Sequence, residues 1–330
     1  MGIHALPLPL SLSLLLIASA GKSIEASRLK VSIPASGQPI PELIYQQALL
    51  EADLAELMEV CADAARFGLA QRMRELRNRL MLVAPSPQPF DVVIANAQAL
   101  MACKAPVSAQ RVLSRFGPAN GRQRREWLLL SWQAASAALD HAGAALALRR
   151  LADGDLTGLD LERLPVSEER EGNEGNVVTR SALDVLVEHE RALGHLDQAI
   201  SVLLASRTAG AEGAARLGLA ASLLAEMELE QSMPLLESAL DLAAADEAWG
   251  LAIELLRLQL QLELDAGGDG ERPRQRLQRL ASRLDDRYSL WELIREDDQQ
   301  KESAETLDQE LRSPRDPDGH AASEDQSLIP

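Results

Sequence analysis

The chain has 330 residues, of which 46% are hydrophobic and only 3% are aromatic, and it carries a formal net charge of −17. A chain of this length can bury a sizeable core. Alanine and leucine dominate the apolar residues and β-branched residues are sparse, so the composition favours helix over sheet. The negative charge repels nucleic acid and anionic membranes, which makes nucleic acid a poor candidate partner.

Residues 1–40 are an apolar segment followed by an extended lead-in. The apolar run 8–18 ends in Ala18-Ser19-Ala20, a small-x-small pattern typical of a signal-peptidase site. No Lys or Arg precedes the run, two prolines interrupt it, and it is shorter than the ~20 residues of a membrane span. A cytoplasmic location is therefore favoured, and the alternative is export with cleavage after Ala20. A membrane is a partner only if this segment is retained.

The rest of the chain predicts helical hairpins, because apolar residues recur at three- and four-residue spacing between Gly and Pro breaks. The expected pairs are 42–82 with a break at Gly68, 91–103 with 107–116, 122–139 with 144–151, 177–193 with 196–206, 211–226 with 229–244, and 248–264 with 273–286, followed by a short cap at 288–294. This organisation gives N-terminal hairpins (41–152), a flexible acidic and glycine-rich loop (153–176), C-terminal hairpins (177–294) and an acidic disordered tail (295–330).

One internal comparison supports a repeat. A shift of 33 residues lays Leu186 on Leu219, Val187 on Ala220, Ala199 on Ser232, Ile200 on Met233, Leu203 on Leu236 and Ser206 on Ala239. Large residues meet large ones and small residues meet small ones, as stacked hairpins require. An irregular helical bundle is the alternative architecture.

The segment Gly194-His-Leu-Asp-Gln-Ala199-Ile200 with Leu203 resembles the turn and second helix of a tetratricopeptide repeat, and Ser232 to Leu240 is similar. The resemblance is best over residues 180–244. Met227 replaces the turn glycine in the second copy, and the aromatic positions usual in the family are mostly absent. The resemblance implies an all-α, right-handed α-solenoid with a peptide-binding groove, and it transfers no ligand-binding residue.

Motifs for chemistry are incomplete. Cys61 and Cys103 lie in apolar helical contexts, so we expect buried free cysteines rather than a disulfide. His189-Glu190 begins like a zinc-protease helix motif, but Leu193 stands where the second His is needed, and His195 is expected on another face. His141 has no ligand-type companion at useful spacing. We therefore expect no catalytic residue, no metal site and no cofactor.

Arginines cluster in the first half of the chain and give the one candidate binding face. It consists of Arg72, Arg74, Arg77, Arg79, Arg111 and Arg115. A solvated helix face is the simpler interpretation. The functional hypothesis is a non-catalytic scaffold that binds a protein or peptide partner. The alternatives are a helical enzyme or enzyme subunit without a recognisable motif, and a membrane-tethered assembly factor.

Overall fold

The computed structural model describes residues 37–82, 88–168, 177–295 and 300–312. Within these residues the chain is mostly helical, which confirms the all-α class. The helices are α1 (Glu42–Glu51), α2 (Leu54–Arg66), α3 (Ala70–Leu82), α4 (Phe90–Ala102), α5 (Pro106–Leu113), α6 (Arg122–Ala137), α7 (His141–Ala152), α8 (Ala182–Ala192), α9 (Leu196–Leu204), α10 (Gly210–Ala225), α11 (Leu229–Ala245), α12 (Trp249–Asp265), α13 (Glu271–Leu284), α14 (Arg287–Ile294) and α15 (Lys301–Arg312).

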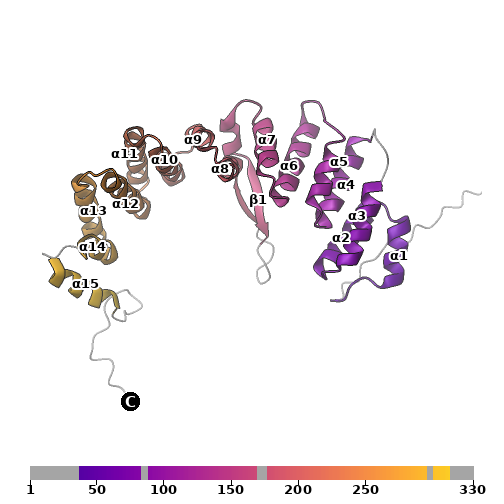
Figure 1. The fold of residues 1–330 in the computed structure, drawn as a ribbon, viewed down its shortest axis with the longest axis horizontal. Helices are drawn as coiled ribbons and strands as arrows, with labels where there is room; N and C mark the ends of the chain where they lie inside the picture. The colour runs from indigo at the N-terminus through magenta and orange to yellow at the C-terminus, as the bar shows by residue number, and fades with distance from the viewer. Residues whose placement is uncertain (1–36, 83–87, 169–176, 296–299, 313–330) are drawn as a thin grey trace, which may run out of the picture.

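The helices follow one another along an arc (Figure 1). From α4 onward each helix packs against the next one in the chain, and α2 packs against both α3 and α4. A two-stranded sheet, β1 (Arg163–Glu168) with β2 (Val177–Ser181), projects from the middle of the arc toward its inner side. Contacts are therefore made between neighbours along the sequence, and the two ends of the arc lie far apart.

Five helix connections share one turn geometry. In α2/α3, α4/α5, α6/α7, α8/α9 and α11/α12 three residues join the helices, and the second of them has a positive φ. The residues are Gly68 at 64°, Lys104 at 53°, Leu139 at 57°, Gly194 at 74° and Glu247 at 55°. The N–H of the third turn residue donates to the carbonyl five residues earlier, for example Ala105 to Leu100 at 2.9 Å. These bonds satisfy helix-end carbonyls, so the turn ends one helix and fixes where its partner starts.

The 33-residue shift found in the sequence also relates the boundaries of helices in the structure. The ends of α8 and α10 are 33 residues apart, and so are the starts of α9 and α11. The small residues Ala199 and Ser232, which the comparison aligns, both have 0% exposure. Helix α11 then continues well past the end of α9, so the two hairpins differ in length.

The predicted flexible loop 153–176 is wrong for residues 153–168. Residues Leu156–Asp160 form a 3-10 turn and β1 pairs with β2 in antiparallel register, with an irregularity between Pro165 and Ser167. The expected helix from 177 is also wrong at its start, because β2 occupies residues 177–181. Leu159 and Leu164 are each 1% exposed and pack with α7 and α8, which explains why this polar segment folds. Residues 169–176 lie outside the described part.

Two smaller differences between the predicted and the observed helices occur toward the ends of the chain. The expected first helix is divided, because α1 ends at Glu51 and Asp53 begins α2 with a capping box to Glu56. The predicted disordered tail is wrong for residues 301–312, which form α15 and contact α14 through the ion pair Arg287 to Glu310. Residues 1–36 and 313–330, including the possible leader and most of the tail, lie outside the described residues.

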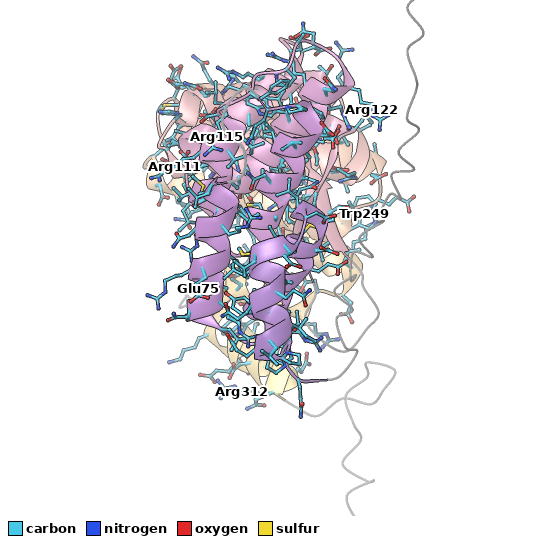
Figure 2. All side chains as sticks on the ribbon, turned by 90° about the vertical axis from the view of Figure 1, so that its right-hand side faces the viewer. Glu75, Arg111, Arg115, Arg122, Trp249 and Arg312 are labelled. Atoms are coloured by element: carbon cyan, nitrogen blue, oxygen red, sulfur yellow. A yellow bond between two sulfur atoms is a disulfide. The ribbon has the colours of Figure 1, made fainter. Side chains whose placement is uncertain are left out.

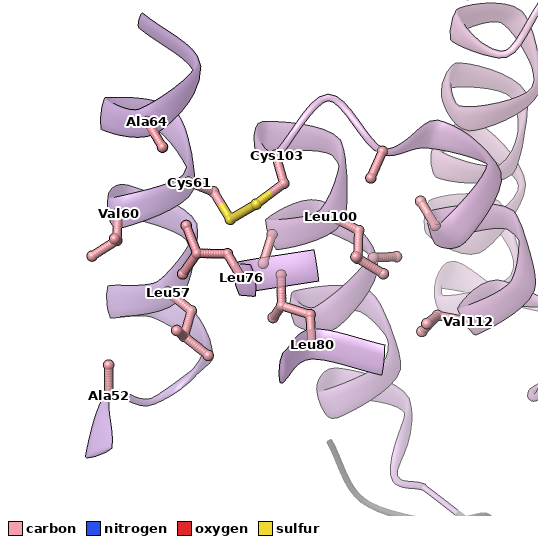
Figure 3. Packing of buried hydrophobic residues seen from close by; sticks show 14 of the residues in the cluster. Ala52, Leu57, Val60, Cys61, Ala64, Leu76, Leu80, Leu100, Cys103 and Val112 are labelled. Carbon is pink, nitrogen blue, oxygen red and sulfur yellow. A yellow bond between two sulfur atoms is a disulfide. The ribbon is translucent and has the colours of Figure 1, made fainter. Parts of the chain in front are cut away.

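The expectation of free cysteines is wrong. Cys61 on α2 and Cys103 at the end of α4 form a disulfide, with the two Cα atoms 4.6 Å apart and both side chains 0% exposed (Figure 3). Leu57, Leu76 and Leu100 surround it in the N-terminal hydrophobic cluster. The bond joins the first helices of two successive hairpins, so the pairing depends on tertiary packing and not on local sequence.

Candidate functional site

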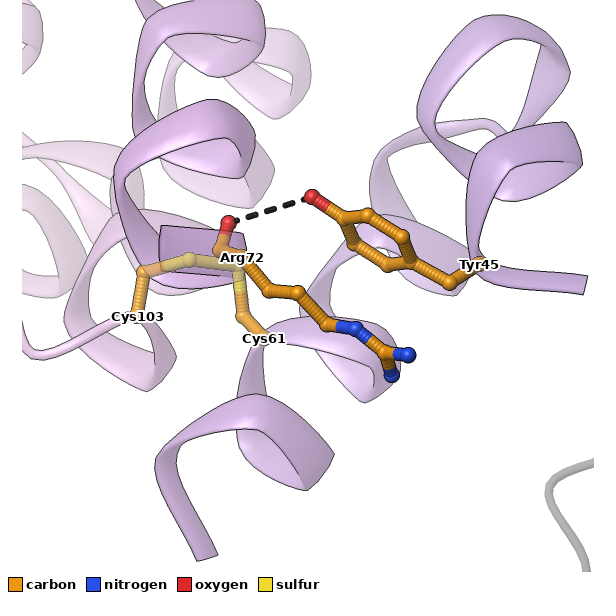
Figure 4. The surroundings of a disulfide bond; sticks show 4 residues. All are labelled: Tyr45, Cys61, Arg72 and Cys103. Carbon is orange, nitrogen blue, oxygen red and sulfur yellow. Dashed lines mark hydrogen bonds between the residues drawn. A yellow bond between two sulfur atoms is a disulfide. The ribbon is translucent and has the colours of Figure 1, made fainter. Parts of the chain in front are cut away.

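Two arginines of the predicted binding face hold α1 in place. Arg72 donates to the carbonyl of Ile40 at 2.6 Å and pairs with Glu42 at 2.7 Å. Its guanidinium carbon lies 4.5 Å from the centre of the Tyr45 ring, and the Tyr45 hydroxyl lies near the Arg72 carbonyl (Figure 4). Arg79 donates to the carbonyl of Leu49 at 3.1 Å, near the end of α1. These two side chains are therefore occupied by structural contacts.

Tyr45 anchors the same contact from the other side. Its hydroxyl donates to Glu75 at 2.6 Å. Burial and the hydrogen bond to Glu75 raise the pKa of Tyr45 far above its usual value, so the phenol stays protonated and keeps donating. The hydrogen bonds from Tyr45 and Gln71 lower the pKa of Glu75. The contact is a clamp between α1 and α3 rather than a reactive site.

The other four predicted arginines remain candidates for partner binding. Arg74 and Arg111 are exposed, whereas Arg77 and Arg115 are partly buried. The Nε of Arg77 is buried without a hydrogen bond, and α3 and α5 are in contact. Figure 2 shows Arg111 and Arg115 on one side of the molecule and Arg122 on the opposite side. Arg122 therefore lies on a different flank from these two members of the predicted face.

A stronger basic surface lies on α13, which sequence reasoning missed. Four of its arginines, Arg272, Arg276, Arg279 and Arg283, are spaced by four, three and four residues, so they share one face of the helix. That spacing was the signal available in the sequence. Arg276 pairs with Glu237 of α11 at 2.9 Å. Burial acts to raise the pKa of Glu237, but hydrogen bonds from Gln259 and Arg276 outweigh it and lower the pKa.

A hollow of about 290 Å³ lies beside this basic face, between α11, α12 and α13. Its apolar lining includes Leu240, Trp249, Leu256 and Leu280, and its basic lining is Arg276, Arg279 and Arg283. Trp249 lies on the same flank as Arg122 and opposite Arg111 and Arg115 (Figure 2). The hollow is thus separate from the face that the sequence predicted.

A deeply buried arginine belongs to a structural network. Arg216 on α10 has 5% side-chain exposure and contacts Asp160 at 2.5 Å, Asp184 at 2.8 Å and Glu212 at 2.7 Å. Burial acts to lower its pKa, but these carboxylates raise it overall, so the guanidinium stays charged. Arg216 also donates to Ser206 at 2.8 Å, in the segment between α9 and α10. The network ties the 3-10 turn, α8 and α10 together.

The histidines do not have the surroundings predicted for them. His141 was expected to stand alone, but its Nδ1 lies 3.0 Å from Nδ1 of His189. The indole of Trp132 donates to Nε2 of His189 at 3.3 Å, so His189 is neutral with its proton on Nδ1, facing His141. Burial, and then the neighbouring His141, lower the pKa of His189. His195 contacts Glu190 at 3.0 Å, which in turn pairs with Arg149.

The described residues contain neither a candidate metal site nor a candidate membrane span. Within them no three His, Cys, Asp or Glu side chains come together in a way that could hold a metal ion. In the same part of the chain no helix is both long and apolar enough to cross a bilayer. The described residues therefore offer ion pairs and open hollows, and the predicted absence of a metal remains a prediction.

Comparison with known proteins adds no family. No protein-family model matches the sequence, and no curated protein is significantly similar to it. What can be stated of the class is that the protein is mostly helical, with helical hairpins packed in chain order.

Proposed function

We propose that the protein is a non-catalytic helical-repeat scaffold that holds a segment of another protein. In this proposal the hairpins form a right-handed α-solenoid of the tetratricopeptide-like type, as the resemblance over residues 180–244 implies. The observation that carries the proposal is the shared three-residue turn of four successive hairpins, together with the 33-residue offset between α8/α9 and α10/α11. Stacked hairpins of this kind create long exposed surfaces, which suit binding of extended partners.

The arrangement of charged groups supports binding more than catalysis. Arg72, Arg79 and Arg216 make contacts that hold elements together, and Glu237 is paired with Arg276. Catalysis needs a nucleophile, acid or base beside a substrate cavity. The rival proposal, a helical enzyme or enzyme subunit, relies on the pair His141 and His189, in which the partly buried His141 could exchange a proton.

The disulfide favours export of the protein, which is the alternative to a cytoplasmic location. Disulfides persist mainly in oxidising compartments, and they are rare where thiols are kept reduced. The chain has two cysteines, and both are used in the buried Cys61 to Cys103 bond. We propose that the segment ending at Ala20 is a cleaved leader. Sequencing the mature N-terminus tests this, because a chain that begins at Gly21 supports export and an intact Met1 contradicts it.

Affinity capture with the intact chain tests the scaffold proposal. The tagged protein is crosslinked to its partners in cells of its source, and each captured protein is then purified and titrated calorimetrically against the chain. A saturable complex of fixed stoichiometry with a folded chain supports the scaffold. Turnover of a small substrate by the purified chain, abolished by His141→Ala, would instead establish the enzyme alternative.

A further inference from the structure

The groove beside α13 combines an apolar floor with a basic rim. Leu240 and Leu256 form the floor and are 5% and 4% exposed, so the surrounding helices enclose most of their side chains. Trp249 is 37% exposed and Leu280 is partly exposed, and both line the same hollow. An aromatic and a leucine side chain that face solvent beside a hollow are features of binding surfaces.

The positive charge at the rim is only partly neutralised. Arg276 has Glu237 as its partner, whereas neither Arg279 nor Arg283 has a carboxylate within ion-pair distance among the residues that the structure describes. Asp241 is the acidic residue in the lining. This unbalanced positive edge stands in contrast to a chain with a net charge of −17. Its complement is a group of carboxylates.

The size of the hollow limits the occupant. Pockets for whole small molecules are usually about 300–1,000 Å³ and bury most of the ligand. At about 290 Å³ this hollow suits one or two large side chains of a longer segment better than a complete small molecule. A polynucleotide is disfavoured by the charge of the whole chain, and Trp249 is the only aromatic residue in the lining.

We propose that this groove binds an acidic segment of a partner protein that carries a large apolar anchor. The anchor enters the hollow between Trp249 and Leu280, above Leu240 and Leu256. Carboxylates on either side of the anchor pair with Arg279 and Arg283. The inference rests on the proposed scaffold function, and it specifies the surface and the chemistry of the partner.

Fluorescence anisotropy with the full-length chain tests the proposal. The probe is a labelled peptide with the sequence Gly-Glu-Asp-Phe-Leu-Glu-Asp-Gly, and two control peptides replace either its acidic residues by Lys or its Phe-Leu pair by Ser-Ser. We expect a dissociation constant in the micromolar range that weakens with added salt, and no saturable binding of either control. Absence of binding by the acidic probe at low salt would overturn the proposal.

Variants locate the site on the chain. Arg279→Gln with Arg283→Gln should weaken binding of the probe about tenfold. Leu280→Ser should weaken it without removing a charge. The control Arg150→Gln with Arg191→Gln removes the same two charges from exposed positions on α7 and α8 and should leave affinity unchanged. Equal affinity for the α13 variant and the wild type would overturn the proposal, and circular dichroism checks that every variant is folded.

Two other occupants are separate outcomes. If the probe binds only after residues 313–330 are removed, the groove belongs to the chain's own tail and the proposal of a foreign partner is wrong. If the α13 variants dissociate a dimer seen by light scattering, the occupant is a second copy and the proposal is equally wrong. Captured partners that bind the α13 variants as well as the wild type would refute this groove while leaving the scaffold function intact.

Discussion

The Cys61 to Cys103 disulfide gives the sharpest prediction about stability. The bond links residues 42 positions apart, and both sulfurs are buried. Closing a loop of that length lowers the entropy of the unfolded chain by an amount worth about 4 kcal/mol at 25 °C. Typical domains are stable by about 5–15 kcal/mol. The double variant Cys61→Ala with Cys103→Ala should therefore lose a large part of the stability of its hairpins.

Urea unfolding measures the loss of stability, and hydrogen exchange shows which helices lose it. The lost free energy should appear as faster exchange in α2 and α4, which belong to the N-terminal hydrophobic cluster, whereas α11 belongs to another cluster and should be unaffected. The single variant Cys61→Ala is the control, because it also removes the bond and should lose a similar amount. If the double variant and the oxidised wild type unfold at the same urea concentration, the reasoning is refuted.

Three further predictions concern single residues. Leu139→Gly should raise the free energy of unfolding by about 1 kcal/mol, because Leu139 has φ of 57° and is 77% exposed; an unchanged urea midpoint contradicts this. Arg216→Met should cost about 3–5 kcal/mol, because Asp160 and Asp184 keep their charges without their partner; a melting curve like that of the wild type would show that the network contributes little. The pKa of His189 is lower in the folded chain than in the unfolded chain, so as the pH falls the unfolded chain takes up the proton at a higher pH. The free energy of unfolding should therefore fall as the pH drops below about 6.5, and it should level off below the pKa of the folded chain. Melting temperatures at pH 7.5 and 5.5 measure that fall, and His189→Gln should reduce it; an equal fall in the variant would assign it to other groups.

The positions of most helices could be predicted because local signals determine them. Proline, glycine and apolar spacing marked the breaks, and the structure places helix boundaries within a few residues of those marks. The division between α1 and α2 also had a signal, the capping pair Asp53 and Glu56, which was overlooked. The β-branched run at Val177 pointed to a strand, but the following helix was predicted to begin there.

The disulfide and the surfaces depend on contacts that the sequence does not display. Cys61 meets Cys103 only because α2 packs against α4, and Arg72 appears as a surface cation until α1 is placed over it. The histidine pair has the same character, since α7 must lie beside α8 before His141 and His189 can touch. The face of α13 was different, because its arginine spacing was visible in the sequence and only the hollow beside it required the fold.

The hydrophobic interior is a row of clusters that share helices. On α6, Ala134 is buried in the first cluster and Ala135 in the second, and on α10, Ala220 and Ala221 divide in the same way between the second and third. Each shared helix must therefore be apolar on two faces, which explains why alanine and leucine dominate the composition. Because each hairpin contacts chiefly its neighbours, a change at α13 has no direct packing route to α3. In the scaffold that we propose, a partner at the α13 groove and another near Arg74 and Arg111 would therefore bind with little coupling between them. Loss of binding at one surface should thus leave affinity at the other unchanged.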